Sequence, residues 1–244
     1  MLTFHAINLI IHIASGFTAL TVGVVPMVAQ KGGKLHKRSG TVFFWAMFGV
    51  FITATASWLQ HPEKPFLQFL LLVGFFSFHM ALTGVRTLRL KKSADQPAHI
   101  DWFVAGVAMI AGTAAILFGS WQLYSGLTSG QSFPFFSILY LVFGVFFLRH
   151  GQVDWWVYSG RVQAEKLHWF FHHITRMVGA YIAAFTAFCV VNGDKIPLPS
   201  LVVWTLPGAI GGFFIARTIR YYKQKFDRKA AQGLSGDLTT GVTN

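Results

Sequence analysis

Long runs of apolar residues, separated by short polar clusters, dominate the pattern along this chain. A helix that crosses the hydrocarbon of a membrane needs about 20 mostly apolar residues. Runs of this kind lie at residues 4–29, 40–60, 66–87, 101–124, 133–149, 167–191 and 199–217. The pattern therefore predicts an all-α fold, a polytopic bundle of seven transmembrane helices. A basic and partly disordered tail is expected at residues 218–244.

The composition is that of a membrane protein. Hydrophobic residues make up 54% of the 244 residues and charged residues only 11%, against about a quarter in a typical soluble domain. The chain therefore has too little polar surface to cover itself in water. Its single cysteine, Cys189, excludes an intramolecular disulfide and a cysteine-based metal cluster. The first apolar run is longer than a signal-peptide core and has no basic residue before it, so we expect a retained span.

Positive charge is distributed unevenly between the two sides of the predicted bundle. Nearly all lysines and arginines lie in the first, third and fifth loops and in the tail, whereas only Lys64 and Lys195 lie in the loops between them. Loops rich in Lys and Arg stay in the cytoplasm, which predicts an outside N-terminus and a cytoplasmic C-terminus. The net charge of +12 comes from these clusters. They favour contact with anionic lipid head groups and not with nucleic acid.

Acidic residues are expected only outside the membrane interior. Each of the eight falls in a predicted loop, in the tail or at the edge of a span: Glu63, Asp95, Asp101, Asp154, Glu165, Asp194, Asp227 and Asp237. Proton-coupled pumps and many transporters carry the proton on an intramembrane carboxylate. The predicted placement therefore argues against that class of protein.

Histidines, in contrast, occur inside the predicted spans. His79 lies about two turns from the cytoplasmic end of the third span, and His172 and His173 lie about two turns from that end of the sixth, at about 1.5 Å per residue. Three imidazoles from two helices are therefore expected at similar depth, in the cytoplasmic half of the membrane. His36 and His168 are expected just beneath them.

Spacing along the sixth span places an arginine behind these imidazoles. His168, His172 and Arg176 follow one another at intervals of four residues and share a helix face, whereas His173 points about 100° away. Arginine keeps its charge in the membrane and needs an anionic partner there. Since no carboxylate is expected at this depth, an anionic cofactor group such as a heme propionate, or a lipid head group, is the predicted partner.

Three segments, "HIASG", "KGGKLHKRSGTVFF" and "HHITRMVGAYIAAFTAF", resemble an uncharacterised prokaryotic family of predicted multi-span membrane proteins that is known only as a domain of unknown function. Its most specific features here are His36 with Gly40, and the set His172, His173, Arg176, Gly179 and Tyr181. The resemblance covers most of the membrane portion and implies a bacterial inner-membrane location. It implies no particular activity.

A b-type heme protein with a redox role, serving an electron-transfer partner, is the leading functional hypothesis. Heme iron takes axial imidazoles from facing helices, and its propionates favour arginine. The candidate cofactor-binding residues are His79, His172, His173, Arg176, His36 and His12. A transition metal in a redox role is the related expectation.

Two other functions stay open. An intramembrane zinc-dependent lipid hydrolase would use imidazole ligands, here His79, His172, His173 and His168. Such a site usually needs a carboxylate as general base, which Glu165 or Asp154 could supply only by folding back. The last alternative is a carrier, receptor or assembly protein whose histidines form a polar network without a cofactor. A retinal protein is excluded because the last span lacks a lysine.

Overall fold

The computed structural model describes residues 3–92, 95–129, 135–162 and 167–240, with side chains to residue 228, and within these ranges it contains helices and no strand. The α-helices and the two 3₁₀ helices are α1 (Phe4–Val22), α2 (Val25–Val28), α3 (Lys34–Gln60), α4 (Pro65–Arg86), η1 (Thr87–Arg89), α5 (His99–Thr128), α6 (Phe135–Tyr158), α7 (His168–Val191), η2 (Gly193–Lys195) and α8 (Ser200–Thr240).

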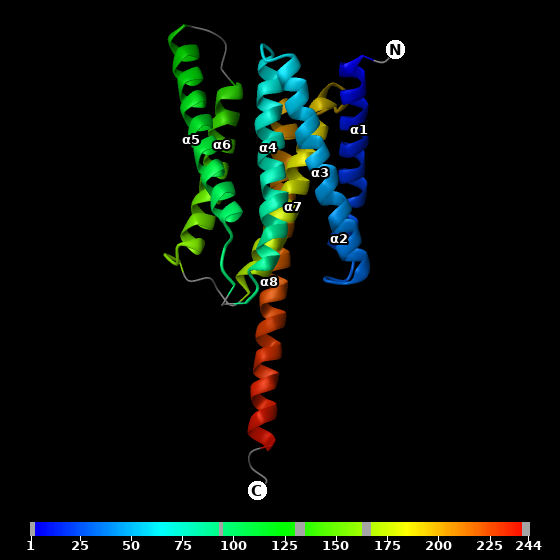
Figure 1. Ribbon diagram of the computed structural model, residues 1–244, viewed down its shortest axis with the longest axis vertical. Coiled ribbons are helices and arrows are strands. Elements are labelled where there is room, and N and C mark those ends of the chain that lie inside the picture. Colours follow the sequence, from blue (N-terminus) through cyan, green and yellow to red (C-terminus); the bar gives the residue numbers. More distant parts are fainter. Residues whose placement is uncertain (1–2, 93–94, 130–134, 163–166, 241–244) are drawn as a thin grey trace.

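Seven helical stretches among the described residues are long and apolar enough to cross a membrane. This confirms the prediction of an all-helical, multi-pass membrane protein. The helices run up and down the bundle in alternation (Figure 1), so the segment before α3, the segment after α4 and the start of α7 lie at one end. We call this the basic end because residues 31–38 and 86–92 supply its lysines and arginines.

Helix α6 extends further than the apolar pattern predicted. The predicted span ended at residue 149, but α6 continues to Tyr158 and carries Asp154 inside the bundle, with 1% of the residue exposed. The prediction that every carboxylate lies in a loop or at a span edge is therefore wrong for Asp154. The apolar window ended early because His150 and Asp154 are polar, although Oδ1 of Asp154 finds partners on α7 and Nδ1 of His150 lies 2.6 Å from the backbone oxygen of Phe146. Residues 133–134 of the predicted span lie outside the described residues.

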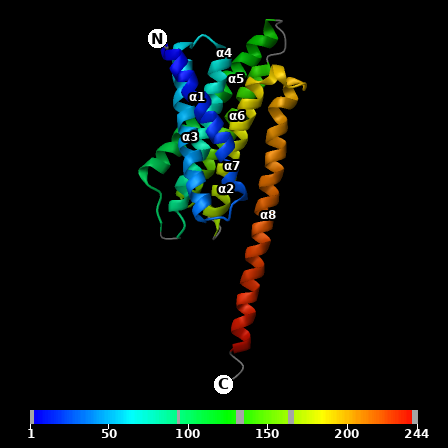
Figure 2. The same cartoon turned by 90° about the vertical axis from the view of Figure 1, so that its right-hand side faces the viewer.

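Helix α8 also differs from its prediction. It runs without a break from Ser200 to Thr240 and projects straight past the basic end (Figure 2), whereas a span ending at residue 217 and a partly disordered tail were expected. Aromatic contacts support the continuation, since the ring of Phe170 at the start of α7 lies 5.1 Å from Tyr222 and 5.5 Å from Phe226. The tail predicted as partly disordered is thus helical up to Thr240, and residues 241–244 lie outside the described part.

Small residues allow close approach within two helix pairs. Added side chains at Gly112 and Gly144 would meet backbone atoms of the facing helix between α5 and α6. Between α4 and α7, an added side chain at Gly84 would meet Arg176 and Met177, and one at Gly179 would meet Met80. Such contacts hold membrane helices together through van der Waals packing. They place the polar residues of α7 directly against α4.

An aromatic seam joins the α5–α6 pair to the rest of the bundle. The buried ring of Phe69 on α4 lies 5.5 Å from Phe143 on α6, and Phe76 lies 5.4 Å from Phe147, both in edge-to-face geometry. Edge-to-face pairs contribute about 0.5–1.5 kcal/mol each beyond the burial of their area. The seam aligns α6 with α4 and α7 and brings Asp154 to Arg176.

Candidate functional site: a buried Asp–Arg–His network

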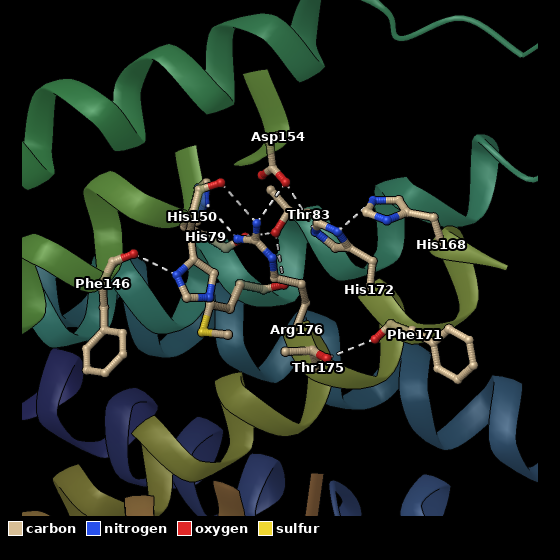
Figure 3. Close-up of polar contacts among 11 residues, drawn as sticks. His79, Thr83, Phe146, His150, Asp154, His168, Phe171, His172, Thr175 and Arg176 are labelled. Carbon is tan, nitrogen blue, oxygen red and sulfur yellow. Dashed lines mark hydrogen bonds and ion pairs between the residues drawn. The ribbon is translucent and has the colours of Figure 1, made fainter. Parts of the chain in front are cut away.

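A hydrogen-bonded ion pair lies at the centre of the site. Arg176 on α7 and Asp154 on α6 are 3% and 1% exposed, and Nη2 of Arg176 donates to Oδ1 of Asp154 at 2.8 Å (Figure 3). The same Nη2 lies 3.2 Å from the backbone carbonyl oxygen of His150. Asp154 therefore supplies the anionic partner that Arg176 needs. The anionic cofactor group or lipid head group predicted for that role is replaced by a residue of the chain itself.

His172 connects this ion pair to the start of α7. Its Nε2 lies 3.2 Å from Oδ1 of Asp154, and its Nδ1 lies 3.2 Å from Nε2 of His168 (Figure 3). With a proton on Nε2, neutral His172 donates to the carboxylate and accepts from His168. This tautomer is assigned from the hydrogen-bond partners. The three side chains form a continuous chain from the bundle interior toward the basic end.

His79 completes the network from α4. It is 3% exposed, and its Nε2 lies 3.4 Å from Nη1 of Arg176. Because a guanidinium can only donate, His79 accepts with the lone pair of Nε2 and is neutral in this arrangement. Its ring lies 5.0 Å from that of Phe147, which fixes it between α4 and α6.

One oxygen of the central carboxylate has no partner. Oδ2 of Asp154 is buried and makes no hydrogen bond to the described residues. A buried acceptor without a partner costs about 1–3 kcal/mol. The same atom offers a place for a proton or a water molecule in the bundle interior, next to the ion pair. Asp154 thus combines a fixed partner on one oxygen with an open position on the other.

The structure brings together only some of the predicted site residues. His79, His172 and Arg176 meet as the depth argument predicted, and His168 joins them through His172. His173 points away from this group, as its angular position predicted, and its Nδ1 lies 2.7 Å from the backbone oxygen of Gly84.

Two further predicted residues lie apart from the network. His36 neighbours His173, with ring centroids 6.2 Å apart. His12 lies between α1 and α3, where its Nδ1 is 2.8 Å from Oγ1 of Thr53. The predicted site residues therefore lie in three separate places: the Asp154 network, the His36–His173 pair and the contact of His12 with Thr53.

Sequence reasoning missed two members of the site. It placed Asp154 outside the membrane interior, in a loop or at a span edge, and left His150 out of the candidate site, whereas both lie on α6 near Arg176. One signal was available, because Phe147, His150 and Asp154 follow one another at intervals of three and four residues and continue one face of the preceding helix. The partner of Arg176 lies on that face.

The contacts of the imidazoles bear on the metal and heme hypotheses. Nε2 of His79 faces Arg176, and Nε2 of His172 faces Asp154, so neither imidazole directs that nitrogen toward a shared metal position. No group of three or more His, Cys, Asp or Glu within the described residues is arranged to hold a metal ion. In particular, His173 lies on another face from the zinc ligands proposed beside it. His79, Arg176, Asp154 and His172 instead contact one another and form a polar network.

A second ion pair lies between α4 and α5. Arg86 donates from Nε and Nη2 to the two carboxylate oxygens of Asp101, with Nη2 to Oδ2 at 2.9 Å. Asp101 is 5% exposed and also accepts from the backbone N–H of Ala98 at 2.8 Å. Both acids thus come from the α5–α6 pair and both arginines from the α4–α7 pair.

Comparison with known proteins adds no relative, since no family model, curated protein or solved structure matches the chain. The resemblance to the uncharacterised family stays a prediction from its motifs.

Proposed function

We propose that this protein is a cofactor-independent, proton-coupled membrane carrier in which Asp154 binds the transported proton. The observation that carries the proposal is the buried carboxylate of Asp154, which accepts from Arg176 and His172 on Oδ1 and has an open acceptor in Oδ2. Intramembrane carboxylates paired with arginine and histidine are typical of proton relays in pumps and transporters. Such a protein is one form of the cofactor-free carrier that the sequence predicts as an alternative.

The histidine chain gives the proton a route to this carboxylate. A proton that binds Nδ1 of His168 allows the proton on Nε2 of His168 to pass to Nδ1 of His172. The proton on Nε2 of His172 then passes to Oδ1 of Asp154. One proton enters and one arrives on the carboxyl group, and each imidazole keeps one proton with its tautomer reversed. Rotation of the rings restores the starting arrangement.

Protonation of Asp154 would couple proton binding to helix movement. The neutral carboxyl group no longer attracts the Arg176 guanidinium, so the strongest polar contact between α6 and α7 weakens. The α5–α6 pair is then held to the remaining helices by the aromatic seam and the Arg86–Asp101 ion pair. A change in its position relative to α7 would open a path for a solute.

The positive-inside rule favours a cytoplasmic basic end, with the N-terminus outside. The resemblance to the uncharacterised prokaryotic family favours the inner membrane of a bacterial cell. Protons would then reach His168 from the cytoplasmic side. Contacts with anionic lipid head groups are expected at the same end. Heme b, a bound transition metal and a zinc hydrolase stay predictions of the sequence, and the partners of His79 and His172 favour none of them.

Proton flux into proteoliposomes tests the proposal. Purified protein is reconstituted with a pH-sensitive dye inside the vesicles, and flux is started with a potassium gradient and valinomycin. The key variant is His172→Gln, which leaves the Asp154–Arg176 ion pair in place but cannot relay a proton. We expect flux at least roughly tenfold below that of the unchanged protein, in line with the loss of a positioned proton-transfer group.

Glu63→Gln is the matched control because this side chain is exposed at the other end of the bundle and lies far from the network along the chain. It should keep the flux of the unchanged protein. Equal flux in the His172→Gln and Glu63→Gln variants, or no flux above that of empty vesicles with the unchanged protein, would contradict the proposal.

A further inference from the structure

A second group of cationic side chains gathers at the basic end, outside the Asp154 network. His36 at the start of α3 and His173 on α7 have ring centroids 6.2 Å apart, with an interplanar angle of 61°. Lys31, before α3, and Lys91, after η1, are the lysines whose charges act on His173. We call these four residues the basic cluster. They come from three separate stretches of the chain.

The segment before α3 is shaped to hold Lys31 and His36 in place. Gly32 adopts a positive φ of 78°, a left-handed conformation that favours glycine. The turn brings Nζ of Lys31 to 2.8 Å from the backbone oxygen of Pro26 and 2.6 Å from that of Met27. Nδ1 of His36 lies 3.0 Å from the same oxygen of Pro26. The end of α2 thereby anchors both side chains.

In both imidazoles, Nδ1 contacts a backbone carbonyl and Nε2 stays available to a ligand. Nδ1 of His36 donates to Pro26 and Nδ1 of His173 donates to Gly84, at 3.0 and 2.7 Å. Among the residues that the structure describes, neither Nε2 has a hydrogen-bond partner. A half-buried pair of imidazoles with fixed ring orientation and open Nε2 atoms is ready to bind a group from outside the chain.

The charge of the basic cluster is uncompensated. No described carboxylate pairs with any of its four side chains, since Asp101 and Asp154 bind Arg86 and Arg176. Lys91 instead lies over the ring of Trp169, with Nζ 4.9 Å from its centroid. Burial lowers the pKa of Lys31 below its usual value, so a nearby anion would stabilise its charged form.

We propose that the basic cluster binds the phosphate group of a phosphate-bearing anion. Two ammonium groups beside the imidazoles would repel a metal cation, whereas they attract an anion. Phosphate offers several acceptor oxygens to lysine donors. The anion is supplied either by an anionic phospholipid at the membrane surface or by a soluble phosphate compound. The site is separate from the Asp154 network and does not depend on proton transport.

Binding should be linked to proton uptake. An imidazole whose Nδ1 already donates to a backbone carbonyl can donate from Nε2 only when it is protonated. His36 and His173 therefore bind an anion most strongly as imidazolium ions. The other charged groups that act on His173 are Lys31 and Lys91. The affinity of the basic cluster should rise as the pH falls below neutral, into the range in which imidazoles gain a proton.

Calorimetric titration of the detergent-purified full chain tests this inference. The probes are short-chain phosphatidylglycerol, short-chain phosphatidylcholine and inorganic phosphate. Phosphatidylglycerol keeps a single negative charge over this pH range and so reports on the protein alone. We expect it to bind more tightly than phosphatidylcholine. Binding of inorganic phosphate to the same residues identifies a soluble ligand, whereas binding of phosphatidylglycerol alone identifies a lipid.

The double variant Lys31→Gln/Lys91→Gln should weaken binding by roughly fivefold for each lysine removed, the effect of about one basic residue near an anionic group. Lys64→Gln/Lys195→Gln removes two lysines outside the basic cluster and should bind as the unchanged protein does. His173→Gln should abolish most of the pH dependence.

If Lys31→Gln disturbs the turn, Lys91→Gln alone carries the test because its side chain is exposed. Equal binding by this variant and the unchanged protein, or no binding of either anion, would overturn the inference.

Discussion

Asp154 is the central hydrogen-bond acceptor of the polar network in the bundle interior. Its Oδ1 accepts from both Arg176 and His172, and its Oδ2 has no partner among the described residues. Removing one partner of a buried ion pair leaves the other charge unpaired in a medium of low dielectric, at a cost of about 3–5 kcal/mol. Removing both charges at once avoids that penalty. The two situations can be separated by mutation.

We therefore expect Asp154→Asn to lower the free energy of unfolding by about 3–5 kcal/mol, because Arg176 is left without its carboxylate. The double variant Asp154→Asn/Arg176→Gln should recover most of this loss. Unfolding by SDS from mild detergent, followed by circular dichroism, measures both values. A double variant that is as unstable as the sum of the two single variants would show that the residues do not act as a pair.

The sequence allowed part of this site to be predicted. The depth of His79, His172 and Arg176 in two spans was sufficient to place them together, because position along a helix converts directly into depth. Asp154 was missed because a polar residue near the end of an apolar run looks like a loop residue until its partner is known. A buried ion pair cannot be recognised from one of its members.

At the scale of the helices, apolar length predicted the spans well and their ends poorly. The seven candidate spans of the structure correspond to the seven apolar runs. Because of polar residues, the predicted run began too late for α3, which begins at Lys34, and ended too early for α6, which continues to Tyr158. In α6, the contacts of Asp154 with Arg176 and His172 on α7 hold a polar residue near the end of the helix. Helix α8 continues beyond its apolar run for a different reason, its aromatic contacts with α7.

The charged residues of the interior are divided between two pairs of helices. The α5–α6 pair supplies Asp101 and Asp154, and the α4–α7 pair supplies Arg86 and Arg176. The two ion pairs join the same two groups of helices at the same end of the bundle. Release of one of them by protonation would therefore leave the other intact, an arrangement suited to a limited movement between the pairs.

At the scale of the whole molecule, the asymmetry of positive charge is the strongest signal of orientation. Lysines and arginines concentrate at the end of the bundle from which α8 projects (Figures 1 and 2). The rule that keeps such segments in the cytoplasm predicts the orientation independently of the number of spans. With seven spans, the same rule predicts an N-terminus outside and a cytoplasmic C-terminus.

Cysteine labelling tests this orientation. In a Cys189→Ala background, Glu63→Cys should react with a membrane-impermeant maleimide in intact spheroplasts, because it lies in a segment with few positive charges and is exposed. Lys34→Cys, at the basic end, should react only after permeabilisation. The reverse pattern would show that the bundle has the opposite orientation and that protons enter the histidine chain from outside.

The most direct test of the central claim is infrared difference spectroscopy of the reconstituted protein before and after acidification. Proton binding by Asp154 should produce the C=O stretching band of a newly protonated, buried carboxylic acid. This band should shift in Asp154→Glu and disappear in Asp154→Asn, while it stays unchanged in the exposed control Glu63→Gln. A spectrum without such a band, or a band that Asp154→Asn retains, would contradict the assignment of Asp154 as the proton-binding group.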